Sequence, residues 1–416
     1  MGGRVSLNFI HTGFPALRHR NFRLFWFGQC ISLIGTWMQN IGQSWLVLEL
    51  TNSALKLSIV TTMQFLPVMI FSLYAGTLVD RLPKRKVLLC TQSALAVLAA
   101  VLATLTYFKV VEYWHVLILA LLLGTVNTLD MPTRQSFVIE LAGKEDLPNA
   151  IALNSSIFNL GRIIGPAVAG LLIGLIGIAP CFYLNAVSFL AVIANLWMIH
   201  VPSKAAKEKE FGSLERVYLD IREGLSYINQ KKIIKRPLLL LAFISTFVMN
   251  YNILVPVFAQ QELNQNATGY GLLMTGMGIG SFTGSLAMVA GSKKNPKLRY
   301  LIAGAFAMSA FLVLLAPEKS FRLACVTLFF IGFFSIIFTT MVNTTIQLNS
   351  SDDMRGRVMS VYTLVFGGVT PIGSLFTGQV TEYAGAPGCM LISGIIGIFA
   401  AACTAFITWS SRQTSK

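Results

Sequence analysis

The chain consists of long apolar runs separated by short polar segments. A helix needs about 20 apolar residues to cross the hydrocarbon core of a bilayer, and runs of this length recur along the whole sequence. Twelve spans are predicted, at approximately 22–50, 55–79, 86–107, 115–138, 149–175, 180–200, 237–260, 268–291, 298–316, 321–345, 356–384 and 387–410. The pattern predicts an all-α membrane protein with twelve transmembrane helices.

The longest polar stretch, residues 201–236, divides the predicted spans six and six. We therefore expect an N-terminal six-helix bundle over 1–200, a cytoplasmic linker over 201–236 and a C-terminal six-helix bundle over 237–416. Apolar residues at helical spacing predict an amphipathic helix in the linker, with Ser213 as its N-cap. Its apolar face is Leu214, Val217, Tyr218, Ile221, Leu225 and Ile228. We interpret the linker as a tether, with a regulatory docking site as the alternative.

The two halves also echo each other. Pro166 follows Asp146 by 20 residues, and Pro371 follows Asp353 by 18 residues. Two pseudo-symmetric bundles around a central substrate cavity are the expected architecture for such internal repeats.

The net charge of +15 follows the predicted membrane topology. With the amino terminus inside, 27 of the 32 Lys and Arg residues fall on segments at the inner face. The positive-inside rule predicts this asymmetry and places both termini in the cytoplasm. The basic charge therefore reflects topology, and nucleic acid is not an expected partner.

No catalytic constellation is apparent in the sequence. The six cysteines fall inside apolar spans without metal-type spacing, and we find no Ser/His/Asp grouping and no phosphate-binding loop. We therefore expect no enzyme activity, no cofactor and no metal site.

A charged loop lies between the second and third spans, in the sequence Gly76-Thr-Leu-Val-Asp80-Arg81-Leu-Pro-Lys84-Arg85-Lys86. Its Gly76, Asp80, Arg81, Lys84 and Arg85 resemble the loop 2–3 signature of the major facilitator superfamily. Pro83 stands where that signature has a second glycine.

The resemblance implies a twelve-helix transporter in which Asp80 contacts the cytoplasmic ends of helices 4 and 11 and closes an inner gate. Arg134 and Glu140 in the fourth span, and the helix start near Arg355 and Arg357, are the candidate partners. The second half lacks an acid at the matching place, so we expect an asymmetric gate.

A second motif, formed by Gly161, Gly165, Pro166 and Gly170 in the fifth span, is similar to the helix-5 motif of drug/proton antiporters. Proline removes a backbone donor and bends a helix, while glycines allow close packing on a neighbour. The functional interpretation is a bend that shapes the cavity and limits leakage. The alternative is an ordinary packed kink.

Two charged residues are expected deep in the membrane. Arg162 lies roughly 20 Å along the fifth span at about 1.5 Å per residue, and Asp130 lies inside the fourth. Because a charge at mid-bilayer is costly unless it is paired or faces water, we predict that Asp130 and Arg162 form a pair, direct or bridged by one water molecule, that couples transport to protons. Glu49 is a second candidate for proton coupling. The alternative is a structural pair between Asp130 and Arg134, one turn away.

The other polar residues within spans are mostly uncharged, and they predict a cavity for a bulky amphipathic ligand. The alternative for any one of them is helix packing, which is the more frequent role of such residues. The cavity candidates are Trp37, Gln39, Asn40, Gln43, Gln64, Asn154, Asn159, Asn250, Tyr251, Asn343 and Tyr362.

Further stretches resemble the branch of the superfamily that contains bacterial macrolide-efflux proteins and the enterobactin exporter. They are residues 21–26, 35–40, 130–136 and 162–170. The resemblance implies export of an amphipathic, drug-like small molecule by proton antiport, from a monomer in the bacterial cytoplasmic membrane. A dedicated exporter of a siderophore or lipid, and a non-transporting membrane sensor, are the alternatives.

Overall fold

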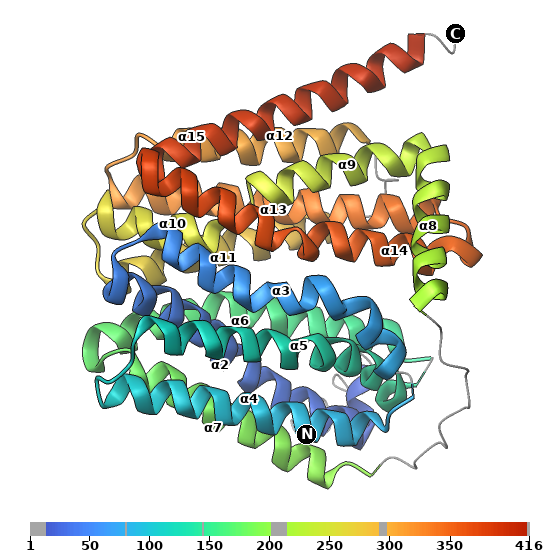
Figure 1. The fold of residues 1–416 in the computed structure, drawn as a ribbon. Helices are drawn as coiled ribbons and strands as arrows, with labels where there is room; N and C mark the ends of the chain where they lie inside the picture. The colour runs from blue at the N-terminus through green and yellow to red at the C-terminus, as the bar shows by residue number, and fades with distance from the viewer. Residues whose placement is uncertain (1–13, 80, 144, 201–213, 291–297, 414–416) are drawn as a thin grey trace, which may run out of the picture. The chain divides into compact units, whose positions relative to one another are not determined.

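A computed structural model describes residues 14–79, 81–143, 145–200, 214–290 and 298–413. These residues form helices and connecting turns, without a strand among them. The elements of the first half are η1 (Pro15–Arg18), α2 (Arg20–Thr51), α3 (Ala54–Val79), α4 (Lys84–Tyr107), α5 (Tyr113–Ala142), α6 (Leu147–Ile176) and α7 (Ala179–Met198). They are followed by α8 (Leu214–Gln230), α9 (Lys232–Phe247), α10 (Tyr251–Gln261), α11 (Ala267–Ala290), α12 (Leu298–Leu315), α13 (Phe321–Asn349), α14 (Asp352–Thr363), the π-helical turn η2 (Leu364–Gly368) and α15 (Thr370–Gln413) (Figure 1).

The helices account for the twelve predicted spans. Among the described residues, 10 segments are long and apolar enough to cross a membrane. One of them, Asp353–Ser410, has 58 residues and is divided at Gly385, where the backbone is non-helical with φ of 71°. It therefore provides two crossings, and α2, with 32 residues, provides the remaining one.

One predicted span is interrupted. Residues 237–260 were expected to form a continuous helix, but α9 ends at Phe247 and α10 begins at Tyr251. The Asn250 side chain donates to the carbonyl of Thr246 over 2.7 Å, which satisfies one carbonyl at the end of α9. A side-chain amide thus replaces part of the backbone hydrogen bonding at the break.

The chain divides into two compact units. Unit 1 comprises Met1–Gln43 and Ile70–Phe211, and unit 2 comprises Ser44–Met69 and Gly212–Lys416. Both α2 and α3 are consequently shared between the units.

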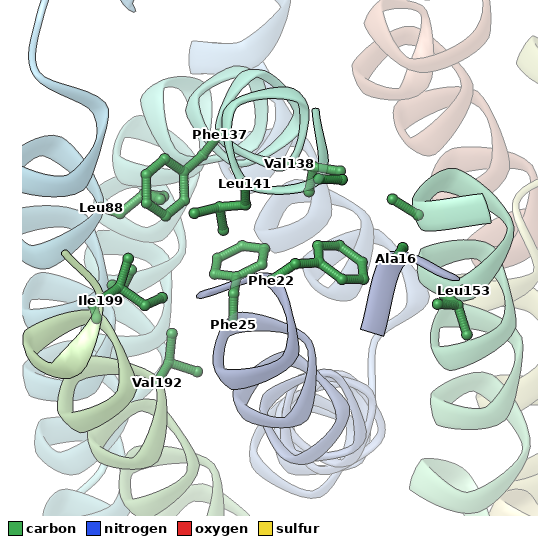
Figure 2. Close-up of a cluster of buried hydrophobic side chains, with 13 residues drawn as sticks. Ala16, Phe22, Phe25, Leu88, Phe137, Val138, Leu141, Leu153, Val192 and Ile199 are labelled. Atoms are coloured by element: carbon green, nitrogen blue, oxygen red, sulfur yellow. The ribbon is translucent and has the colours of Figure 1, made fainter. Parts of the chain in front are cut away.

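Unit 1 has a buried hydrophobic cluster near the starts of α2 and α4 and the end of α5. Phe25 of α2 meets Phe137 of α5 edge to face, with ring centroids 5.6 Å apart. Figure 2 shows Leu88, Leu141 and Ile199 around the same aromatic pair. We call this group the aromatic cluster.

In unit 1, α2 packs closely on α7 through glycines spaced seven residues apart. A Cβ atom at Gly35 would lie 2.6 Å from the Asn185 side chain, and one at Gly28 would lie 2.9 Å from that of Asn195. Seven residues are about two helical turns, so these positions share one face of α2. Glycine lets the two helices approach at this seam.

In unit 2, α11 and α13 cross at a glycine seam. A Cβ at Gly280 would lie 1.9 Å from the carbonyl oxygen of Phe329, and one at Gly332 would lie 2.1 Å from that of Met277. Side chains at these two positions are excluded sterically. In the same unit, α12 packs against α15, whose C-terminal turns lead away from it (Figure 1).

The predicted linker helix forms as α8, whereas its predicted N-cap, Ser213, lies outside the described residues. Within unit 2, α8 is attached to α14 by polar contacts. Glu223 pairs with Arg357 over 2.6 Å, and the Tyr227 hydroxyl lies 3.1 Å from Ser351 Oγ. The apolar side of α8 is divided, since Ile228 is buried while Leu225 is half exposed.

Candidate functional site

The most deeply placed acid among the described residues is Asp130 of α5, whose side chain has no exposed surface. Thr91 Oγ1 and Gln92 Nε2 donate to Asp130 Oδ1 over 2.7 and 2.8 Å. Arg134 donates to Oδ2 and forms an ion pair with the carboxylate. Three donors and one positive charge therefore hold this buried acid.

Three helices of unit 1 position these groups. Asp130 and Arg134 are four residues apart in α5, so both lie on one face of the helix. The neighbouring residues Thr91 and Gln92 present their donors from α4, which packs along α5. From α2, Gln29 Oε1 accepts a 2.6 Å hydrogen bond from Arg134 Nη1.

The site retains unused hydrogen-bonding capacity. Gln29 Nε2, Gln92 Oε1 and Arg134 Nε are buried and have no hydrogen-bond partner within the described part of the chain. Because buried polar atoms are normally paired, these two donors and one acceptor suit an additional small polar guest such as a water molecule.

The aromatic cluster closes one end of the site. Phe25 lies one turn before Gln29 in α2, Leu88 lies one turn before Thr91–Gln92 in α4, and Phe137 lies one turn after Arg134 in α5. Since α4 runs antiparallel to α5, all three place the cluster at the same end of the polar group. Apolar side chains thus separate Asp130 from that end of unit 1.

The ion pair of Asp130 observed in the structure is the one with Arg134, the partner named by the local alternative. Asp130 is engaged by its own helix and by α4, as the local alternative required. The Arg162 guanidinium instead lies 6.0 Å from the ring centroid of Trp37 on α2. An ion pair within one helical turn forms without help from a second helix, and it competes with the longer-range one.

Two basic residues of the charged loop, Lys84 and Arg85, bind to other residues of unit 1. Lys84 pairs with Glu140 at the end of α5. Arg85 donates to the carbonyls of Leu196 and Trp197 over 2.8 and 3.0 Å. These carbonyls belong to the last turn of α7, where the helix leaves acceptors unsatisfied.

Of the other three motif residues, the structure describes Gly76 and Arg81. Gly76 lies in the last turn of α3 and Arg81 follows the helix, whereas Asp80 lies outside the described residues. Arg134 and Glu140, expected near Asp80, contact Asp130 and Lys84. Arg357, another expected partner, pairs with Glu223 of α8.

The second motif packs α6 against α2. A Cβ at Gly165 would lie 2.4 Å from the Trp37 Cβ, and one at Gly161 would lie 3.0 Å from the Trp37 Cδ1. Pro166 and Gly170 are buried in the same helix, which continues through the proline. Trp37 also meets Phe158 edge to face at 5.7 Å. The glycines thus accommodate an indole.

The cavity candidates of unit 1 include packing residues. Gln39 is buried and accepts a 2.6 Å hydrogen bond from Asn185, which joins α2 to α7. Asn159 donates to the carbonyl of Ser155 in its own helix. Asn154 is half-buried, and its Oδ1 has no hydrogen-bond partner within the described residues. Asn40 is half-buried and Gln43 is buried.

In unit 2, Asn343 and Tyr362 are brought together by a side-chain hydrogen bond. Gln347 donates to Asn343 Oδ1 over 2.5 Å, and the Tyr362 ring stacks on Phe366 at 5.9 Å. This small amide–aromatic group joins α13 to α14 and η2.

The other candidates of unit 2 differ in exposure. Asn250 and Tyr251 are buried at the break between α9 and α10, and Gln64 is half-buried. Glu49 is exposed and accepts a 2.7 Å hydrogen bond from the Trp45 indole, whose ring stacks on Tyr270.

Sequence reasoning missed four polar partners. Gln29, Thr91 and Gln92 surround Asp130, and their signal was an amide or hydroxyl group within an otherwise apolar run. Glu382 of α15 accepts hydrogen bonds from Ser53 Oγ at 3.0 Å and from the Leu55 amide at 3.1 Å. It thereby satisfies hydrogen-bond donors at the start of α3. The local sequence pattern did not predict this role.

Comparison with protein families gives one match over nearly the whole chain. The family model described as transmembrane secretion effector matches residues 11–414. The chain is 26% identical to the staphyloferrin A transporter of Staphylococcus aureus, over 90% of this chain and 92% of the relative. It is 25% identical to the multidrug efflux pump Tap of Mycolicibacterium fortuitum, over 85% and 89%. Identity to macrolide efflux protein A of Streptococcus pyogenes is 23%, over 90% and 93%.

Solved structures confirm the fold. The nucleoside transporter NupG superposes with a TM-score of 0.71 at 13% identity, covering 93% of this chain and 99% of that one. A bacterial homologue of the human lysosomal transporter Spinster gives a TM-score of 0.73 at 13% identity, covering 94% and 97%. Both are named as transporters, and likenesses at this identity show the fold alone.

Proposed function

Because the chain belongs to the transmembrane secretion effector family of the major facilitator superfamily, we propose that it exports an amphipathic small molecule in exchange for protons. The family makes it a transporter, not an enzyme, in the plasma membrane. Relatives named for multidrug and macrolide efflux support a drug-like cargo. The uncharged amide–aromatic residues of the spans support the same class of ligand.

The observation that carries the proton-coupling proposal is the burial of the Asp130 carboxylate beside Arg134. An ionisable group inside a membrane helix is costly to keep and is commonly part of a transport or proton pathway. Thr91, Gln92 and Arg134 stabilise the ionised carboxylate. Protonation removes that charge, loosens the hold on Arg134 and biases the equilibrium between two conformations.

Arg162 and Glu49 take lesser roles in this proposal. Arg162 lies against Trp37 and contributes positive charge to the face where α2 meets α6. Glu49 is exposed and is the second candidate for proton coupling. In this proposal, Asp80 and the loop bases close the inner gate, while the α6 glycine motif limits leakage.

The proposed arrangement places both termini in the cytoplasm and six spans on each side of the linker. The protein acts as a monomer by rocker-switch alternating access, in which one bundle moves against the other around a fixed site. The distribution of Lys and Arg supports the orientation.

Purified wild type and Asp130→Asn in proteoliposomes test this function. An imposed proton gradient drives uphill movement of an amphipathic fluorescent dye by wild type, while internal pH is recorded. We expect Asp130→Asn to lose gradient-driven accumulation and to retain exchange of labelled for unlabelled dye. Glu145→Gln, which neutralises an exposed acid between α5 and α6, is the matched control and retains both.

Unchanged accumulation by Asp130→Asn would remove Asp130 from the coupling step. Dye binding without movement by wild type would indicate a sensor instead of a carrier.

A dedicated exporter of a siderophore is the second candidate, favoured by the likeness to the staphyloferrin A transporter. Competition distinguishes the two, because a dedicated exporter binds its siderophore far more tightly than it binds unrelated dyes. A polyspecific exporter binds several dyes with comparable affinity.

A further inference from the structure

A hollow with a volume of about 550 Å³ lies between α12 and α15 in unit 2. Ile302 and Phe306 line it from α12, and Ala402 and Ala405 line it from α15. Arg299 and Trp409 lie at one end of it. We call this hollow the α12–α15 groove.

The C-terminal turns of α15 diverge from α12 (Figure 1), and small side chains line the α15 wall of the groove. Ala402 and Ala405 are one turn apart on the face of α15 that meets α12, so two methyl groups stand where larger side chains would fill the space. Phe306 is half exposed beside them. Both helices are membrane spans, so the surrounding solvent is hydrocarbon and the apolar walls suit an acyl chain.

The end of the groove carries a positive charge. Arg299 is exposed in the first turn of α12, donates to the Tyr300 hydroxyl over 2.8 Å and lies 4.7 Å from the Tyr300 ring centroid. Trp409 is 58% exposed, which marks this end as a place where an aromatic ring meets the membrane interface.

The sequence that precedes Arg299 is also positively charged. Lys293, Lys294 and Lys297 precede Arg299, and no acidic residue occurs between 291 and 300. By the positive-inside rule this end of α12 faces the cytoplasm, whose leaflet holds the anionic lipids.

We propose that the α12–α15 groove binds one phospholipid with an anionic headgroup from the cytoplasmic leaflet. One acyl chain fills the space beside Ala402 and Ala405, and the phosphate accepts charge-assisted hydrogen bonds from Arg299. A zwitterionic headgroup brings its own ammonium close to Arg299, whereas an anionic headgroup does not. The groove therefore prefers phosphatidylglycerol to phosphatidylcholine with the same chains.

Native mass spectrometry of the delipidated full-length protein tests the proposal. Phosphatidylglycerol and phosphatidylcholine with identical acyl chains are titrated separately, and the dissociation constant of the first bound lipid is measured. We expect wild type to prefer phosphatidylglycerol and Arg299→Gln to weaken that binding by roughly tenfold, as loss of a hydrogen bond to a charged group requires. Arg322→Gln, an exposed arginine at the start of α13, is the matched control and leaves binding unchanged.

A second variant tests the groove itself. Ala405→Phe fills the space for the acyl chain and weakens both lipids while Arg299 remains, and melting temperature reports whether the variant is folded. Equal affinity of wild type for the two lipids would overturn the proposal. An equal loss of phosphatidylglycerol affinity in Arg299→Gln and Arg322→Gln would also overturn it, because that result indicates a diffuse effect of surface charge. Undiminished lipid binding by folded Ala405→Phe would overturn it as well. If Ala405→Phe does not fold, the two arginine variants decide.

Discussion

Arg134 pairs with Asp130 across a single turn of α5, and the carboxylate that it pairs with is wholly buried. The two residues belong to one helix, so their pairing does not depend on how the two units of the chain are arranged. Gln29, Thr91 and Gln92 complete the hydrogen bonding from neighbouring helices. In the proposed alternating-access mechanism, this pair can therefore persist in both conformations.

The first prediction concerns the two single variants of this pair. Arg134→Gln leaves a buried carboxylate without its cation, and breaking a buried pair in this way costs about 3–5 kcal/mol. Asp130→Asn leaves a cation that is 24% exposed, so we expect a smaller loss. Melting temperatures of the purified variants are measured at a pH above the ordinary pKa of carboxyl groups. We expect the melting temperature of Arg134→Gln to be lower than that of Asp130→Asn.

The double variant Asp130→Asn, Arg134→Gln supplies the control. It removes both charges at once, so its stability exceeds that expected from adding the two single losses. Strictly additive losses would mean that the two side chains do not interact.

The second prediction concerns the glycine motif of α6. Gly165→Ala places a methyl group 2.4 Å from the Trp37 Cβ, so α6 and α2 must separate. Overpacking of this kind costs about 1–3 kcal/mol, and we expect lower melting temperature and reduced transport. Gly356→Ala is the matched control, because a Cβ there meets no atom within 4 Å.

Gly161→Ala should fall between these variants, since its new methyl group lies 3.0 Å from the edge of the Trp37 ring. A loss in Gly356→Ala as large as that in Gly165→Ala would contradict the steric explanation.

The spans were predictable because hydropathy and length alone decide which segments cross a membrane. The break at Asn250 was not, because residues 237–260 read as a continuous apolar run. Ser245 of α9 lies beside the π-helical turn at Leu364–Gly368, with its hydroxyl 3.0 Å from the Val365 carbonyl oxygen and 2.7 Å from that of Leu241 in its own helix. A contact between residues so far apart in the chain has no signal in the local sequence.

The polar site was predictable in part. Asp130 stood out as an acid within an apolar run, and both of its possible arginine partners were identified from the sequence. Spacing along two antiparallel helices made Arg162 level with Asp130, yet it could not specify which faces the two residues occupy. Helical periodicity guaranteed only that Arg134 shares a face with Asp130, and that local pair is the one observed.

The third prediction concerns Arg85 in the charged loop. Its guanidinium donates through two nitrogens to the carbonyls of Leu196 and Trp197 at the end of α7. A lysine cannot reproduce this planar fork, so Arg85→Lys should destabilise unit 1 by about 1 kcal/mol, and Arg85→Gln by more. Hydrogen exchange at the last turn of α7 measures the loss directly. Lys86→Gln, an exposed neighbour, should leave that exchange unchanged, and equal effects of both substitutions would argue for a general role of loop charge.

The last prediction is a pH dependence of the contact between α8 and α14. Hydrogen bonds with Lys231 and Ser351 lower the pKa of Tyr227 from its ordinary value of 10.0 to about 8, and the one from Lys231 has the largest effect. A lowered pKa means that the docked helix favours the phenolate, so docking strengthens as pH rises from 8 to 10 and this gain is lost as pH falls through 8. Tyrosinate absorbance should show one early-titrating residue that Tyr227→Phe removes and Lys231→Gln shifts to higher pH. Hydrogen exchange of α8, corrected for its intrinsic pH dependence, should slow over the same interval in wild type only. An early step that persists in Tyr227→Phe would assign it to another tyrosine and remove Tyr227 from this contact's pH response.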